Sequence, residues 1–201
     1  MFLIGRKVGM SQIWNEEGKV IPVTVVQAGP VVVTQIKTEE KDGYQAFQVG
    51  YDPSKKKLSK PLKGHLKDLG NFRFLREFKP TQSEISYNVG DKIDVSVFNQ
   101  GDKVKVIGYE KGRGFQGVVK RHGFHGGPKT HGQKNRLRAP GSLGPTAPQR
   151  VIKGRKMAGR MGNERVTIKS EVVGVDKENN LLLIKGPLPG NKKNILLIQK
   201  V

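Results

Sequence analysis

The chain has no cysteine among its 201 residues, which excludes disulfides, zinc–thiolate sites and a thiol nucleophile. It also lacks a long apolar run: stretches such as 181–184 and 195–198 fall far short of the roughly 18 residues of a membrane span. Acidic residues are scarce, with 17 Asp and Glu against 37 Lys and Arg, and the formal net charge is +20. We therefore expect a soluble cytoplasmic protein, with no membrane contact, whose partner is a polyanion.

The positive charge is concentrated in residues 111–165. This segment holds six Lys and eight Arg against one Glu, a net +13, whereas the other 146 residues hold 23 basic and 16 acidic residues, a net +7. It also holds 12 of the 26 glycines, so it has little apolar surface to bury and would repel itself. We expect it to order only on a polyanionic surface. A solvated basic tail is the plainer alternative, but the segment interrupts the chain instead of ending it.

The flanking regions are rich in β-branched residues and predict a mainly β body. Strands are expected at 19–27, 31–37, 44–49, 93–98, 104–109, 165–168, 172–175, 181–184 and 194–200. Between Leu58 and Leu69 four leucines fall at helical spacing, which predicts a short basic helical excursion over about 54–70. Many short strands with frequent turns are typical of a sandwich or a barrel.

The strands on either side of the basic segment are too few to close a core separately. Together they are enough, because about 146 residues bury roughly two-thirds of their unfolded surface. The sequence therefore predicts a discontinuous β body of residues 1–110 and 166–201, from which residues 111–165 loop out as a long, basic, Gly-rich extension.

Three patterns in the basic segment imitate known sites. Residues 112–117 match G-x-G-x-x-G, but neither a long helix nor a ribose-binding acid follows. Residues 123–130 differ from a phosphate-binding P-loop at Pro128, which has no N–H to offer a phosphate. The three histidines of the segment have no cysteine to complete a metal site, and the surrounding lysines and arginines repel cations. We expect no metal, no cofactor and no small-molecule substrate.

A binding surface for RNA remains. Arginine and lysine neutralise phosphates, glycines allow close approach of the backbone, and aromatic or imidazole rings stack on unpaired bases. The segment lacks a long helix for a DNA groove. Two alternatives stay open at this level, a free nucleic-acid chaperone and an RNA-cleaving enzyme that uses His122 and Lys129. Glycine on every side argues against the rigid placement that catalysis needs, so we expect no enzyme.

Several longer motifs resemble the family of bacterial-type large-ribosomal-subunit protein three. They are L-I-G-R-K-V-G-M-S-Q at 3–12, K-G-R-G-F-Q-G-V-V-K-R-H at 111–122, G-P-K-T-H-G at 127–132, R-A-P-G-S-L-G at 138–144 and K-M-A-G-R-M-G-N-E-R at 156–165. The resemblance implies a six-stranded translation-protein-type β-barrel whose extension threads through ribosomal RNA toward the peptidyl-transferase centre. It also implies binding to 23S ribosomal RNA, nucleation of subunit assembly, and contacts with large-subunit proteins fourteen and nineteen. The place of action would be a cytoplasmic ribosome, with an organellar ribosome as the alternative.

The expected RNA-binding residues combine this resemblance with the charge pattern. They are Arg6, Lys7, Lys111, Arg113, Phe115, Lys120, Arg121, His122, Phe124, His125, Lys129, Thr130, His131, Arg136, Arg138, Arg150, Lys153, Arg155, Lys156, Arg160 and Arg165. The tip nearest the peptidyl-transferase centre would comprise Ser142, Gly144, Thr146, Gln149, Arg150 and Arg155. Thr146 stands where some family members carry an N-methylated glutamine, so the resemblance does not carry this modification over to the chain.

Overall fold

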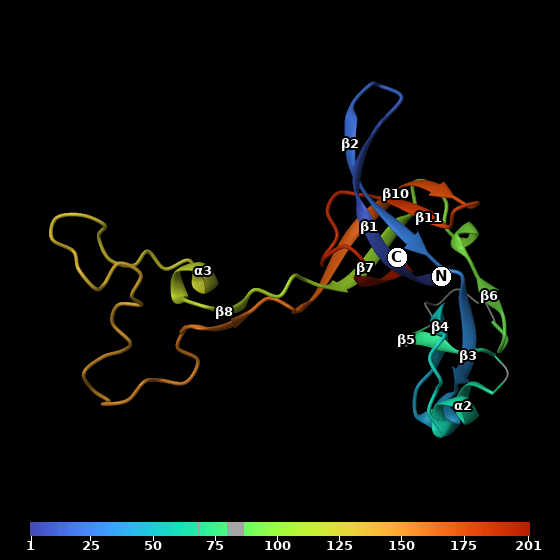
Figure 1. Ribbon diagram of the computed structural model, residues 1–201, viewed down its shortest axis with the longest axis horizontal. Coiled ribbons are helices and arrows are strands. Elements are labelled where there is room, and N and C mark those ends of the chain that lie inside the picture. Colours follow the sequence, from blue (N-terminus) through green and yellow to red (C-terminus); the bar gives the residue numbers. More distant parts are fainter. Residues whose placement is uncertain (68, 80–86) are drawn as a thin grey trace. The chain divides into compact units, whose positions relative to one another are not determined.

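The computed structural model describes residues 1–67, 69–79 and 87–201. The chain divides into two compact units, one made of Met1–Tyr109 with Arg165–Val201 and the other of Glu110–Glu164 (Figure 1). The first unit contains the strands β1 (Phe2–Trp14), β2 (Val20–Ala28), β3 (Val31–Lys37), β4 (Ala46–Pro53), β5 (Phe72–Phe78), β6 (Lys92–Ile93), β7 (Lys103–Tyr109), β10 (Arg165–Asp176), β11 (Leu181–Lys185) and β12 (Ile195–Lys200). Its helices are α1 (Glu39–Asp42), α2 (Lys60–Leu66) and the 3-10 turn η1 (Val95–Val97). The second unit contains β8 (Gly114–Gln116), α3 (Val118–His122) and β9 (Gly159–Met161). The prediction of a mainly β protein is confirmed.

Six strands of the first unit close into a barrel in the order β1-β12-β7-β10-β11-β2. All neighbouring pairs are antiparallel. Side chains alternate between the two faces of a strand, so Val104 and Val106 of β7 are buried while Lys103 and Tyr109 are exposed. Tyr109 at the end of β7 pairs with Arg165 at the start of β10. The pairing of β7 with β10 therefore belongs to the closed barrel, although the 55 residues 110–164 separate these two strands in the sequence.

A second sheet, in the order β5-β4-β3-β6, completes the first unit. Phe2 of β1 stacks on Phe78 of β5 with ring centroids 4.3 Å apart, and on Phe47 of β4 at 6.1 Å. These rings belong to one buried cluster with barrel residues such as Leu196 and Ile198. One continuous core thus joins the sheet to the barrel.

The predicted strand over residues 93–98 is wrong beyond Ile93. The Asp94 carboxylate accepts a hydrogen bond from the Ser96 N–H at 2.9 Å and starts η1. A short polar side chain that bonds its neighbouring backbone competes with strand pairing, and here that local bond prevails.

The observed helix is shorter than the helical excursion predicted over about 54–70. Helix α2 covers only Lys60–Leu66, with Pro61 in its first turn, and Lys67 has a positive φ of 49° that ends it. Asp68, within the predicted range, lies outside the described residues. The sequence did not predict β1 or β5, because neither combines a β-branched run with clear alternation.

Candidate nucleic-acid interface

The Glu110–Glu164 unit begins as two paired strands. Strands β8 and β9 are antiparallel, with Gly114 opposite Met161. Outside this pair the Arg113 N–H donates to the Met161 carbonyl at 2.9 Å, and the Glu110 N–H donates to the Glu164 carbonyl at 3.0 Å. These backbone bonds hold the outgoing and returning segments of the chain side by side. We call residues 110–116 with 159–164 the paired base of the unit.

Gly162 makes this close pairing possible. Its φ is +77°, and a Cβ at this position would lie 2.3 Å from the Lys111 carbonyl oxygen and 3.1 Å from the Gly112 Cα. No side chain fits there without moving backbone, since such a separation is far below van der Waals contact. The glycine is therefore needed both for its left-handed conformation and for the approach of the two chains.

Helix α3 contacts the returning segment of the unit at Met157. The Arg121 Nη1 donates to the Met157 carbonyl at 2.7 Å, and the His122 Nε2 lies 3.0 Å from the same oxygen. Because a carbonyl can only accept, this contact is a hydrogen bond in the tautomer that carries its proton on Nε2. The helix ends at Gly123 in the left-handed conformation, and Val118 is its buried residue.

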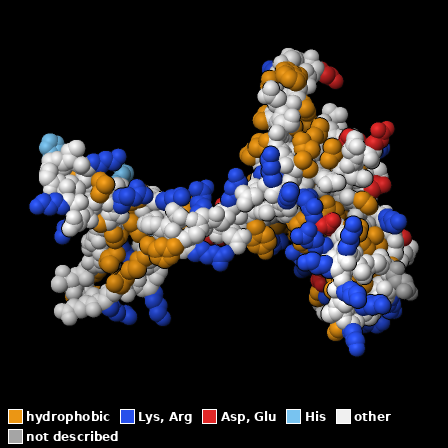
Figure 2. Space-filling model, viewed as in Figure 1, with side chains coloured by type: hydrophobic (Ala, Val, Ile, Leu, Met, Phe, Trp, Pro, Cys, Tyr) orange, Lys and Arg blue, Asp and Glu red, His pale blue; other side chains and the backbone are white. Residues whose placement is uncertain are grey.

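The unit presents its cations to solvent. It contains six Lys and seven Arg against Glu110 and Glu164, a net +11 in 55 residues. All five ion pairs found among the described residues lie in the first unit, so these cations have no acidic partner there. Figure 2 shows Lys and Arg side chains spread along the visible face of this unit.

Most predicted RNA-binding residues of the unit are exposed. These are Lys111, Arg113, Phe115, Lys120, His125, Lys129, Thr130, His131, Arg136, Arg138, Arg150, Lys153, Arg155, Lys156 and Arg160. Arg121, His122 and Phe124 are half-buried, whereas Arg165 is exposed on the first unit. At the predicted tip, Ser142, Gly144, Thr146 and Gln149 are exposed, and the Arg155 Nη2 donates to the Ser142 carbonyl at 2.5 Å.

Comparison with known proteins places the chain among ribosomal proteins. The family model described as Ribosomal protein L3 matches residues 81–180. Large ribosomal subunit protein uL3 of Herpetosiphon aurantiacus is 53% identical over 202 residues, covering 98% of this chain and 95% of the relative. The uL3 proteins of Heliobacterium modesticaldum and Dehalococcoides mccartyi are 54% and 52% identical over 201 and 200 residues, covering 98% of this chain and 95% and 97% of those relatives. The chain belongs to the ribosomal protein L3 family.

Membership of the L3 family determines the general role of the chain. It is a structural protein of the large ribosomal subunit and not an enzyme. Its place is the ribosome, in the cytoplasm, and its partner there is ribosomal RNA.

Arg6 and Lys7, which the sequence also placed in the RNA-binding set, are engaged inside the first unit. The Arg6 Nη2 lies 2.5 Å from the Asp52 Oδ2. Lys7 is 9% exposed, and its Nζ donates to the carbonyls of Leu188 at 2.6 Å and Gly190 at 3.1 Å. Because their charged groups already serve the fold, we propose that neither cation contacts RNA, and the sequence prediction for both stays a prediction.

Sequence reasoning missed the residues that shape the unit without carrying charge. Gly162 and the Met157 carbonyl hold the outgoing and returning segments together, yet the sequence analysis predicted a role for neither. One signal was present for Gly162: Gly and Asn tolerate positive φ, so the pair Gly162–Asn163 favours a turn. The Met157 contact had no signal, because every residue has a carbonyl and only the tertiary structure selects one.

Other features of the described residues offer no competing site. Within residues 1–67, 69–79 and 87–201, no group of three or more His, Cys, Asp or Glu could hold a metal ion. No helix in the same ranges has the length and apolar character needed to cross a membrane.

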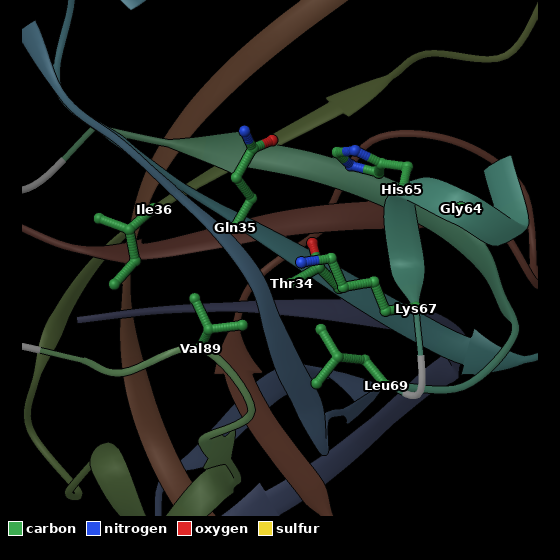
Figure 3. Close-up of a pocket in the computed structure, with 8 residues that line it drawn as sticks. All are labelled: Thr34, Gln35, Ile36, Gly64, His65, Lys67, Leu69 and Val89. Atoms are coloured by element: carbon green, nitrogen blue, oxygen red, sulfur yellow. The ribbon is translucent and has the colours of Figure 1, made fainter. Parts of the chain in front are cut away.

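A cavity of about 640 Å³ lies beside β3 and α2 in the first unit. It is lined by Thr34, Gln35, Ile36, Gly64, His65, Lys67, Leu69 and Val89 (Figure 3). Its imidazole is already partnered, since the His65 Nε2 lies 2.7 Å from the Gln48 Oε1, which also accepts from the Thr34 hydroxyl. None of the predicted RNA-binding residues lines this cavity.

Proposed function

We propose that the Glu110–Glu164 unit is the extension through which this family member binds 23S ribosomal RNA. In this proposal the protein nucleates assembly of the large subunit, and its tip reaches toward the peptidyl-transferase centre. The first unit acts as a translation-protein-type barrel that contacts large-subunit proteins fourteen and nineteen. The proposal combines the family with the charge and geometry of the unit.

The observation that carries the proposal is a cationic surface without an internal counter-charge or a core of its own. The unit has a net charge of +11 and no internal ion pair, and Val118 is its one buried hydrophobic residue, all 55 residues being described. Phe115 is 77% exposed, and Val151 and Ile152 are exposed as well. Such a segment gains little from folding alone and much from neutralisation by phosphates, because each contact releases condensed counter-ions.

The side chains divide by chemistry into two roles. Lysine and arginine meet phosphates, either as point charges or as bidentate forks. This group comprises Lys111, Arg113, Lys120, Arg121, Lys129, Arg136, Arg138, Arg150, Lys153, Arg155, Lys156, Arg160 and Arg165. Phe115, Phe124 and the histidines 122, 125 and 131 offer flat faces to unstacked bases, and the Thr130 hydroxyl can bond a phosphate or a ribose.

Salt dependence of binding tests the electrostatic part. If the extension engages about 6–10 phosphates, the affinity of the full chain for 23S ribosomal RNA should fall by about 10³–10⁵ between 50 and 200 mM salt. The double variant Arg136→Gln/Arg138→Gln should reduce the slope of log affinity against log salt by about 1.4–1.8. The matched variant Lys55→Gln/Lys56→Gln removes two exposed cations of the first unit, and its slope should stay unchanged. A flat response to salt, or equal effects of the two variants, would contradict the proposal.

Shortening the tip tests its reach. Because the Arg155 guanidinium bonds the Ser142 carbonyl, residues 143–154 leave and return at nearby points, and a short Gly-Ser linker can replace them. Reconstituted subunits that carry the shortened chain should contain the protein but form peptide bonds more slowly. The charge variant Arg150→Gln/Lys153→Gln, at full length, separates loss of charge from loss of reach. Normal peptide-bond formation by the shortened chain would refute a role near the catalytic RNA.

Cross-linking of assembled subunits tests the protein contacts. Cross-links from the exposed face of the barrel should reach large-subunit proteins fourteen and nineteen. Cross-links to other proteins alone would remove these two partners from the proposal, while RNA binding by the extension would be unaffected.

A further inference from the structure

The Glu110–Glu164 unit contains a pocket. Its volume is about 410 Å³, and it is lined by Gly123, Phe124, His125, Gly126, Gly127, Arg136, Ala139, Pro140 and Gly141. This volume lies toward the lower end of the range for small organic ligands, about 300–1,000 Å³, and suits one nucleoside better than a stack of several.

Two glycines form the wall of the pocket and hold it open. The Gly127 N–H donates to the carbonyls of Arg136 and Leu137, both at 3.1 Å. A Cβ would lie 2.3 Å from the Leu137 oxygen at Gly126 and 2.6 Å from the Arg136 oxygen at Gly127. The two backbone segments therefore touch directly with no side chain between them. The shape of the pocket is set by these backbone contacts.

The lining has the chemistry of a stacking site. Phe124 is half-buried, and the His122 ring lies beside it with centroids 6.0 Å apart at an angle of 44°, which restrains the phenyl ring. Ala139 and Pro140 add apolar surface, and Arg136 contributes an exposed guanidinium. An aromatic face next to a cation is the combination that binds unstacked bases in single-stranded nucleic acid.

Other ligands fit less well. No acidic residue lines the pocket, so a cationic ligand or a basic peptide finds no counter-charge there. A free phosphate would use Arg136 and leave the phenyl ring and the apolar wall without a role. A neutral, flat ring joined to a phosphate uses the aromatic face and the cation together.

We infer that this pocket receives one unstacked nucleobase of RNA, which stacks on Phe124 while Arg136 neutralises the adjoining phosphate. This inference rests on the proposed RNA-binding function and adds a base-binding subsite to its phosphate contacts. Trp14, an exposed aromatic residue of the first unit that belongs to none of the proposed RNA contacts, lies outside the pocket and provides a control.

The test compares two probes of equal length and charge. One is a single-stranded decamer of riboadenosine, and the other is a decamer of abasic ribose phosphates. At one fixed salt concentration the full chain should bind the adenosine decamer about 5- to 150-fold more tightly, the range expected for one stacked base. Phe124→Ala should reduce this preference without changing binding of the abasic decamer, whereas Phe124→Tyr and Trp14→Ala should retain it.

Each outcome bears on a different claim. Equal binding of the two decamers by the native chain would overturn the base-binding pocket while leaving the phosphate contacts intact. Failure to bind either decamer or 23S ribosomal RNA would overturn the proposed function itself. If Phe124→Ala also weakens binding of the abasic decamer, the ring supports the loop instead of a base, and the inference is wrong. A preference lost equally in Trp14→Ala would place the stacking site outside the pocket.

Discussion

Replacing Gly162 with alanine is expected to open the paired base of the extension while the barrel stays folded. Gly162 has a φ of +77°, and the new Cβ would lie 2.3 Å from the Lys111 carbonyl oxygen. The left-handed conformation costs an alanine about 1–2 kcal/mol, and the overlap with the carbonyl adds to that cost because backbone must move to relieve it. The two backbone bonds made by Glu110 and Arg113 stabilise the paired base by about 1–3 kcal/mol in net terms.

The penalty is thus comparable to the contribution of these two bonds, whose acceptors at Met161 and Glu164 lie on either side of Gly162 in the sequence. A loss of 1–2 kcal/mol lowers the ratio of closed to open forms about 5- to 30-fold. Hydrogen exchange of the Glu110 and Arg113 amides in the full chain measures this ratio, since both amides donate across the paired base. Affinity for 23S ribosomal RNA at fixed salt should fall by a similar factor, because binding must then bring the two separated segments of the paired base together again.

Gly144→Ala is the matched control. Gly144 lies in the same unit, has no positive φ, and has open space where a Cβ would stand. In this variant the Glu110 and Arg113 amides should exchange as in the native chain. If the Glu110 and Arg113 amides exchange equally slowly in both variants, the account of Gly162 is refuted.

Three further predictions concern the first unit. Lys7→Met should lower the free energy of unfolding by about 2–4 kcal/mol in chemical denaturation, because two buried carbonyls lose a charged donor, while affinity for RNA stays unchanged. Burial would raise the pKa of Asp102, but the Asn99 N–H and the Lys200 ammonium outweigh it and hold that pKa below its usual value. Asp102 therefore stabilises the fold above its unfolded pKa of about 3.9 and loses this contribution as pH falls through the folded value, so Tm should fall less steeply on acidification in Asp102→Asn. Phe78→Ala should cost about 3–5 kcal/mol, because Phe78 is 5% exposed in the core.

Each of these three predictions has an outcome that contradicts it. Weaker RNA binding by Lys7→Met at unchanged stability would return Lys7 to the RNA-contacting set. Identical acid profiles of the native chain and Asp102→Asn would exclude a stabilising Asp102 carboxylate. A loss of stability in the exposed control Phe115→Ala as large as in Phe78→Ala would mean that burial does not explain the effect.

The general role of the chain could be predicted from the sequence because it depends on composition and on runs of residues. A segment with 14 cations and one acid needs an anionic partner wherever the chain folds. The strings at 111–122 and 156–165 identify the family, and β-branched runs such as 31–37 predict strands. The exceptions were local: the Asp94 side chain ended a strand, and the pattern of leucines extended α2 beyond its actual range.

Charge, propensity and motif are properties of neighbours in the chain, and the sequence by itself determined the family, the β class and the position of the cationic segment. The tertiary structure decided which distant residues meet. The fold pairs Tyr109 with Arg165 in the barrel and buries Lys7 against carbonyls of a remote loop. It also brings Gly162 into close contact with the Lys111 carbonyl. At least one partner in each contact is a backbone group that every residue possesses, so residue type alone does not predict the pair. Only the packing of the whole chain brings a particular pair together.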